Sequence, residues 1–91
     1  MEFEWDEKKR LKNLETHEID FEDIIPMFNG FTVEIVDDRF DYGETRHLTL
    51  GLVNGIVFVV ISTIRGENSR IISARKATKY EEKSYFEEIA N

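Results

Sequence analysis

The chain has 91 residues, a net charge of −7, no cysteine and an apolar content of 41 %. This length predicts a single domain over residues 1–91, with a small core that buries roughly 60–65 % of the unfolded surface. The absence of cysteine excludes disulfides and thiolate chemistry, and it suits a protein of the reducing cytoplasm. The longest apolar run, residues 55–61, is too short to span a membrane.

Charge is unevenly distributed along the chain. Residues 1–44 contain 14 acidic and 5 basic residues, whereas residues 45–91 contain 5 acidic and 7 basic ones. Five bases stand against one acid, Glu67, within residues 65–79. The net negative charge argues against a nonspecific nucleic-acid coat protein. The local basic patch is compatible with a polyanionic substrate held at one place, or with a sheet edge that cations protect from aggregation.

The N-terminal third predicts one strand and two helices. Residues 2–5 alternate between polar and apolar, as in a short strand. Asp6 is a suitable N-cap for a surface helix that ends near Leu14. Asp20 caps a second helix with a buried apolar stripe, and Pro26 should kink this helix or tighten its last turn.

The rest of the chain predicts four strands and a final helix. Residues 31–36 form a strand, and a polar, turn-rich segment follows at 37–44. Asn54-Gly55 joins two β-rich runs in a type I′ hairpin, a third run follows at 69–76, and a capping box opens the last helix at Thr78. The order β-α-α-β-β-β-β-α predicts an α+β fold with a mainly antiparallel sheet and helices on one face.

The hairpin turn fixes a register in which His47 faces Ser62. If Glu67 and Asn68 form the next turn, Arg65 faces Arg70, Ser62 faces Ser73 and Val60 faces Arg75. Side chains alternate across a strand, so we expect the helices to cover Leu48, Leu50 and Ile61. The opposite, half-open face would then carry His47, Ser62, Ser73 and Arg75, and could hold a small site.

Charged residues gather at the far end of the hairpin, where Glu44, Arg46, Arg65 and Arg70 converge. One interpretation is an ion pair of Glu44 with Arg65, worth less than about 1 kcal/mol if it is exposed. The other is a phosphate clamp, because guanidinium groups bind phosphate with two parallel hydrogen bonds.

Several segments resemble the BrnT toxins of type II toxin–antitoxin systems, which adopt the RelE-like ribonuclease fold. The matching segments are FEWDEKKRLKN, FEDIIPMF, DYGETRHLTLG, VVISTIRG and RIISARKATKYE. They cover almost the whole chain in the right order, and the last is the most specific. One departure concerns the end of the first helix, where the family usually has a glycine and this chain has Glu18.

The resemblance implies a metal-independent endoribonuclease that inhibits translation and needs no cofactor. It also implies neutralisation by a cognate antitoxin with a ribbon-helix-helix DNA-binding domain, so that contact with DNA is only indirect. By position, the arginine of the family's ISAR motif is Arg75, and that of GETR is Arg46.

RNA cleavage without a metal needs a base for the ribose 2′-hydroxyl, cations for the phosphorane and an acid for the 5′-oxygen. We expect His47 or Glu44 to be the base, and Arg75, helped by Arg46 and Arg65, to hold the phosphate. The residues expected to follow the RNA backbone are Arg70, Lys76 and Lys79.

An alternative function remains open: a non-catalytic interaction module of the same fold, which binds a DNA-binding, antitoxin-like partner. It would need only an apolar groove and the acidic helices. In either case the acidic N-terminal half suits a basic antitoxin.

Overall fold

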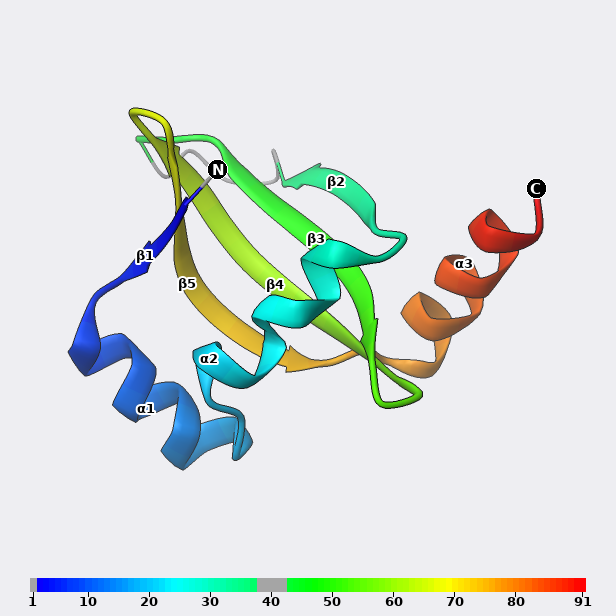
Figure 1. The fold of residues 1–91 in the computed structure, drawn as a ribbon, viewed down its shortest axis with the longest axis horizontal. Helices are drawn as coiled ribbons and strands as arrows, with labels where there is room; N and C mark the ends of the chain where they lie inside the picture. The colour runs from blue at the N-terminus through cyan, green and yellow to red at the C-terminus, as the bar shows by residue number, and fades with distance from the viewer. Residues whose placement is uncertain (1, 38–42) are drawn as a thin grey trace.

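A computed structural model describes residues 2–37 and 43–91 of the chain. Residues 38–42, in the polar segment expected to form turns, lie outside the described residues. The element order β-α-α-β-β-β-β-α is confirmed, with a 3₁₀ turn after the second helix (Figure 1). The elements are β1 (Glu2–Trp5), α1 (Glu7–His17), α2 (Phe21–Ile24), η1 (Ile25–Asn29), β2 (Val33–Asp37), β3 (Arg46–Val53), β4 (Ile56–Arg65), β5 (Asn68–Lys76) and α3 (Lys79–Ala90).

The five strands form one mixed sheet in the order β1-β5-β4-β3-β2. All neighbours are antiparallel except β1 and β5, which run parallel. The α+β class and the mainly antiparallel sheet are therefore as predicted. The parallel pair brings the N-terminal strand beside β5, so that the two strands can place their charged residues next to each other.

The β3–β4 hairpin has the predicted register. His47 pairs with Ser62 and Val53 with Ile56 across the strands. Asn54 and Gly55 have φ values of 50° and 80°, as a type I′ turn requires, and this turn matches the twist of the two strands.

The β4–β5 hairpin differs from the prediction. Its turn consists of Gly66 and Glu67, so Arg65 pairs with Asn68 instead of facing Arg70. A register shift next to Ser62 leaves Ile72 as an extra residue on β5, which is a β-bulge. The predicted pairings of Ser62 with Ser73 and of Val60 with Arg75 are therefore wrong.

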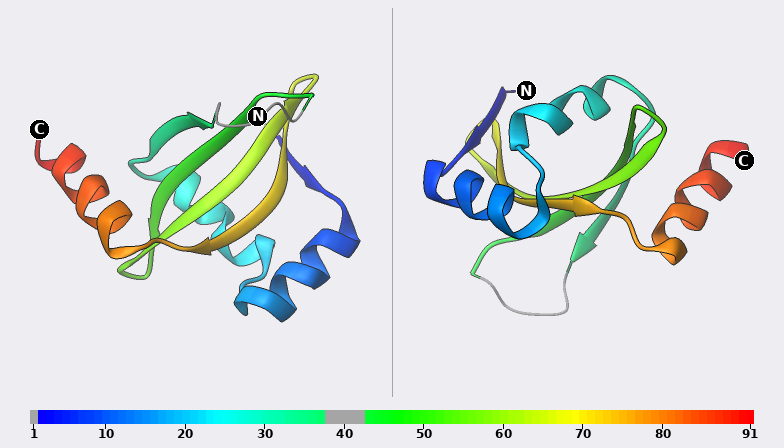
Figure 2. Two further views of the ribbon diagram at one scale, coloured as in Figure 1. Left: turned by 180° about the vertical axis from the view of Figure 1, so that it is seen from behind. Right: turned by 90° about the horizontal axis from the view of Figure 1, so that it is seen from below.

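Helices contact both faces of the sheet. We call the face covered by α1, α2 and η1 the α2 face; its core consists of Phe21, Ile24, Met27, Val60, Ile71 and Ala74, with Ile19 beside them. The opposite face, the α3 face, buries Leu50, Val57 and Val59 against Tyr85 of α3. The two views in Figure 2 show α1 and α2 together on one side and α3 at the far end of the sheet. The expectation that the helices share the Leu50 face is thus wrong for α1 and α2, and right only for α3.

The first helix is capped as predicted but runs three residues beyond Leu14. The Asp6 side chain accepts a hydrogen bond from the Lys8 N–H (2.8 Å), and the helix ends at His17. Glu18 follows in the left-handed conformation, with φ 59° and ψ 31°. Glycine adopts such a conformation without a steric cost, whereas the Cβ atom of a glutamate is strained in it.

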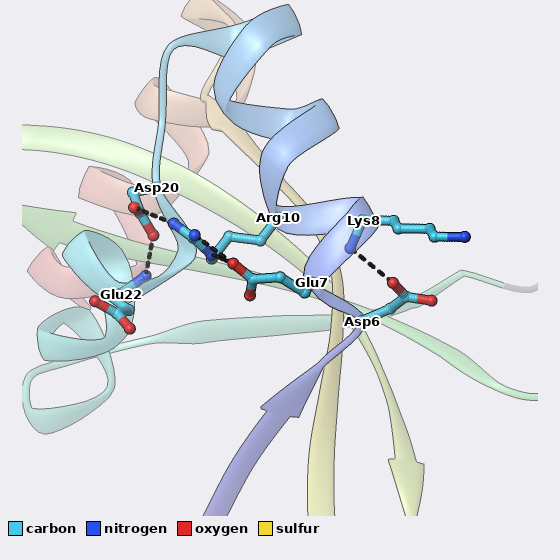
Figure 3. A network of polar contacts seen from close by, with 6 residues as sticks. All are labelled: Asp6, Glu7, Lys8, Arg10, Asp20 and Glu22. Atoms are coloured by element: carbon cyan, nitrogen blue, oxygen red, sulfur yellow. Dashed lines mark hydrogen bonds and ion pairs between the residues drawn. The ribbon is translucent and has the colours of Figure 1, made fainter.

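Arg10 ties α1 to the start of α2 (Figure 3). Its Nη1 donates to Asp20 Oδ2 at 2.7 Å, while its guanidinium also binds Glu7 one turn back on α1. The hydrogen bond from Arg10 lowers the pKa of Glu7. Asp20 in turn accepts from the Glu22 N–H at 3.0 Å, so one carboxylate caps α2 and anchors α1.

The short second helix shows why Pro26 is tolerated. The α-helix stops at Ile24, and the chain continues as a 3₁₀ turn in which Pro26 occupies one of the first two positions, where its missing N–H has no partner to lose. The turn buries Met27, whose side chain lies against Gly51 of β3. A Cβ atom on Gly51 would stand 2.9 Å from Met27 Cβ, so β3 and η1 approach this closely only because residue 51 has no side chain.

None of the helices in the described part of the chain is long and apolar enough to cross a membrane.

Candidate functional site

The α3 face of the sheet carries four arginines. Arg75 pairs with Val59, and Arg70 pairs with Thr63, both of which are α3-face positions of β4. Arg65 follows Thr63 by two residues, and successive side chains of a strand alternate between faces, so Arg65 also points to this face. Arg46 precedes Leu48 by two residues on β3, and Leu48 packs near Leu50.

Three of these arginines gather at one end of the face. Arg46 lies one residue beyond the His47–Ser62 pair, at the level of Thr63, whose partner on β5 is Arg70. Thr63 is buried, and its Oγ1 donates to the Thr45 carbonyl at 2.8 Å, which holds the start of β3 against β4. The predicted convergence of charges at this end of the hairpin therefore occurs, although the direct opposition of two arginines does not.

Within this group, Arg65 and Arg70 each have a carboxylate partner. Glu44 Oε2 lies 3.9 Å from Arg65 Nη2, and Glu4 of the parallel strand β1 lies 3.2 Å from Arg70 Nη1. The Glu44 side chain is 31 % exposed and that of Arg65 is 56 % exposed. At this separation and exposure the Glu44–Arg65 pair contributes little to stability, so both groups remain available to a ligand.

Arg75 stands apart from the group. Arg75 pairs with Val59, and Arg70 pairs with Thr63. Val59 and Thr63 are four residues apart on β4, so Arg75 and Arg70 are separated by about 13 Å along the strands. The guanidinium of Arg75 forms two hydrogen bonds to Glu81 of α3, from Nη1 to Oε1 (2.7 Å) and from Nη2 to Oε2 (3.0 Å). This pair joins the end of β5 to the first turn of α3.

Glu81 serves two partners at once. Its Oε1 also accepts the Thr78 N–H at 2.8 Å, and Thr78 Oγ1 accepts the Glu81 N–H at 3.2 Å, which completes the predicted capping box. The hydrogen bonds from Arg75 and then from Thr78 lower the pKa of Glu81 to about 2, against a partial opposing effect of burial. Glu81 is therefore charged at all physiological pH values.

His47 is not on the face of Arg75, and this corrects the prediction that the two share a face. Its Nδ1 forms a short contact with Glu34 Oε1 of β2. It lines a cavity of about 130 Å³ on the α2 face, together with Glu34, Ser62 and Ser69. His47 and Arg46 are neighbours in one strand, so their side chains point to opposite faces, and the sheet separates the His47 side chain from the arginine side chains of the α3 face.

The two predicted lysines do not extend the arginine face either. Lys76 pairs with Phe58, an α2-face residue, and so points away from Arg75. Lys79 is the exposed first residue of α3. The basic residues that are close in sequence therefore do not form one surface: Arg75 lies on the α3 face, Lys76 on the α2 face and Lys79 at the start of α3.

Two features of this region have no simple signal in the sequence. The Arg75–Glu81 pair spans a strand, a turn and a helix, and no local spacing rule predicts it. The bulge at Ile72 moves Arg75 to the α3 face, and no local sequence pattern marks this bulge. Among residues 2–37 and 43–91, no three histidine, aspartate or glutamate side chains lie close enough together to hold a metal ion.

The fold corresponds to a class of small α+β ribonuclease toxins. Residues 5–81 match the family described as the ribonuclease toxin BrnT of type II toxin–antitoxin systems. The crystal structure of the Brucella abortus ribonuclease toxin BrnT is similar, with 32 % sequence identity and a TM-score of 0.66 over 87 % of this chain and 99 % of that one. A comparison with curated proteins gives no match.

The chain belongs to the BrnT family of ribonuclease toxins of type II toxin–antitoxin systems. Membership of such a system implies a cognate antitoxin as the partner of this chain.

Proposed function

We propose that the chain is an endoribonuclease that needs no metal ion and cleaves RNA on the α3 face of its sheet. The observation that carries this proposal is the set of four arginines on one face, with three of them at one end beside Glu44. Guanidinium groups bind phosphate with two hydrogen bonds each. They can supply the positive charge that a phosphorane needs and that a metal ion supplies in other nucleases.

The scissile phosphate lies at the Arg46 end of the face. Arg46 and Arg65 bind its oxygens there, and Glu44 takes the proton of the ribose 2′-hydroxyl. The 2′-oxygen then forms a bond to phosphorus, the bond from phosphorus to the 5′-oxygen breaks, and water at this exposed face gives the leaving 5′-oxygen its proton. Glu44 replaces His47 as the favoured base, because His47 points to the opposite face. Glu44 is partly exposed, and its carboxylate lies 3.9 Å from Arg65, so a ribose can approach it.

Arg75 binds another phosphate of the same strand. Along the sheet, Arg75 lies about 13 Å from the level of Arg70. This distance is too long for Arg75 to bind the same phosphate at which Glu44 acts as the base. RNA therefore runs along β4 and β5 from the Arg46 end to Arg75. Glu81 holds the Arg75 side chain in place until a phosphate competes for it.

Membership of the family supports the following biological role. Cleavage of RNA stops translation in the cytoplasm, and the cognate antitoxin neutralises the toxin. We infer a ribbon-helix-helix antitoxin with a basic toxin-binding segment, because residues 1–44 are strongly acidic. DNA is contacted through this antitoxin alone. We also infer that the fold is RelE-like, which agrees with the same reaction type.

The experiment compares the kinetics of RNA cleavage by three variants with those of the wild type. The melting temperature of each variant is measured as well, to show that it is folded. Glu44→Gln keeps the shape of the side chain but removes the base, so kcat should fall about 10²–10⁴-fold. Arg75→Ala removes one charged contact worth about 1.5 kcal/mol, so KM should rise roughly tenfold with little change in kcat. The matched control is Glu67→Gln in the exposed β4–β5 turn, which should cleave at the wild-type rate.

A Glu44→Gln variant that melts and cleaves like the wild type would contradict the assignment of the base. Absence of RNA cleavage by the wild-type protein would favour the non-catalytic interaction module. The pairing of Arg70 and Arg75 with carboxylates is the observation in favour of that alternative, because both arginines are already neutralised within the chain.

A further inference from the structure

A basic pocket of about 200 Å³ lies outside the arginine face, between α1 and the edge of β5. Lys9, Lys12, Thr16 and His17 line it from α1, and Ser73 lines it from β5. Its volume is several times the roughly 30 Å³ that one water occupies in the liquid. No carboxylate is among the lining residues, so the pocket combines positive charge with hydroxyl groups.

The fold holds the two walls of this pocket in fixed positions. The last pairing of β1 with β5 is Trp5 with Ile71, and α1 packs along β5 beyond this point. Asn13, which is buried, accepts the Ala74 N–H at 3.0 Å and donates to the Ile19 carbonyl at 2.9 Å. Its side chain thus takes the place of a neighbouring strand, and it fixes the lysines of α1 against the bulged part of β5.

The lysines of the pocket differ from the nearby arginines in their electrostatic state. Arg10, Arg65, Arg70 and Arg75 each have a carboxylate partner. Lys9 and Lys12 form no ion pair within the described part of the chain. An anion can therefore bind to these lysines without first displacing a carboxylate, which makes them more accessible to an anion than the four paired arginines.

One residue of β5, Ser73, relates the pocket to the arginine face. Ser73 pairs with Ile61, an α3-face residue, and also lines the pocket. Arg75 follows Ser73 by two residues, a distance of about 7 Å along the strand. A polyanion bound at Arg75 can therefore continue over the edge of β5 to Lys9 and Lys12.

We propose that this pocket is a third phosphate-binding site, which holds the phosphodiester backbone of single-stranded RNA beyond the nucleotide bound at Arg75. Lys9 and Lys12 supply the charge, and the hydroxyls of Thr16 and Ser73 donate hydrogen bonds to phosphate oxygens. This inference rests on the proposed RNA cleavage and extends its substrate contacts around the sheet edge.

The test measures RNA binding as a function of salt by fluorescence anisotropy. The probe is a labelled single-stranded oligouridine with 2′-O-methyl riboses, which has no 2′-hydroxyl to attack the phosphate. Each phosphate contact contributes about 0.7 to the slope of log K against log salt for single strands. Lys9→Ala/Lys12→Ala should therefore reduce the slope by about 1.4, and Lys9→Arg/Lys12→Arg should keep it.

The charge-matched control is Lys8→Ala/Lys83→Ala. Both lysines are exposed and neither lines the pocket, and in Figure 3 the Lys8 side chain points away from the Arg10 network. This variant has the same net charge as Lys9→Ala/Lys12→Ala, so it should reduce the slope by much less. Equal slopes in the two alanine variants would overturn the proposed site, because net charge alone would then explain the binding.

Two results separate this site from the proposed function. Wild-type cleavage of RNA together with an unchanged slope for Lys9→Ala/Lys12→Ala overturns the site and leaves the catalytic proposal standing. A reduced slope together with no cleavage by the wild type supports the phosphate site and overturns the catalytic proposal.

Discussion

The ion pair between Arg75 and Glu81 predicts a pH-dependent contribution to stability that a single substitution removes. Glu81→Gln takes away the negative charge but keeps an oxygen that can accept the Thr78 N–H, so the helix cap survives. The pKa of Glu81 is about 2, against an ordinary value of 4.5. At about 1.4 kcal/mol for each pH unit, this difference corresponds to roughly 3 kcal/mol.

Solvent reduces this value. The side chains of Arg75 and Glu81 are 29 % and 21 % exposed, and screening at such a site lowers the contribution to about 1–2 kcal/mol. A carboxylate whose pKa is lowered by folding stabilises the protein above its unfolded pKa, and it loses that effect as the pH falls through the folded value. The contribution of Glu81 should therefore be complete above pH 4.5 and nearly absent at pH 2.

The assay is urea unfolding of the wild type and of Glu81→Gln at several pH values between 6 and 2. At pH 6 the variant should be less stable by about 1–2 kcal/mol, and the two curves should meet near pH 2. Glu82→Gln is the matched control, because Glu82 lies in the same first turn of α3 and is exposed. A difference between wild type and Glu81→Gln that stays constant over the whole pH range would refute this reasoning.

Two further substitutions test the packing of the fold. Gly51→Ala places a Cβ atom 2.9 Å from Met27 Cβ and should lower the free energy of unfolding by about 1–3 kcal/mol in chemical denaturation. The control Gly30→Ala, whose new Cβ atom has its nearest contact at 3.8 Å, should change this free energy by less than about 0.5 kcal/mol. Equal losses in the two variants would argue against close packing at Gly51. Glu18→Gly relieves the left-handed conformation at the end of α1 and should raise the free energy of unfolding by roughly 1 kcal/mol; a lower melting temperature would contradict this.

Local signals in the sequence determined the elements and their order. Asp6, Asp20 and Thr78 cap the three α-helices where a side-chain oxygen can reach the first free N–H groups. Asn54-Gly55 determined the register of the β3–β4 hairpin, because only a turn with two positive φ angles fits there. Each of these signals acts within a few residues, so it can be interpreted without knowledge of the rest of the chain.

The faces of the sheet were decided by the tertiary structure. Strands buried in part on both faces, such as β4, carry apolar residues at successive positions, and alternation then does not show which face the larger helical layer covers. The turn at Gly66 and the bulge at Ile72 depend on how β5 packs between β4, β1 and α1. A change of one residue in register moves every later side chain to the other face. A prediction made from the sequence without this bulge therefore placed Arg75 on the same face as His47, which is wrong.

The family resemblance and the presence of a basic β5 were thus available from the sequence, and the geometry of the site was not. Glu44 and Arg65 were correctly expected to meet, because a hairpin brings residues at equal distances from its turn together. The pairing of Arg75 with Glu81 and the lysine pocket beside Asn13 arise where segments distant in sequence pack against each other. Contacts of this kind follow from the three-dimensional arrangement of whole elements, on which local sequence patterns carry no information.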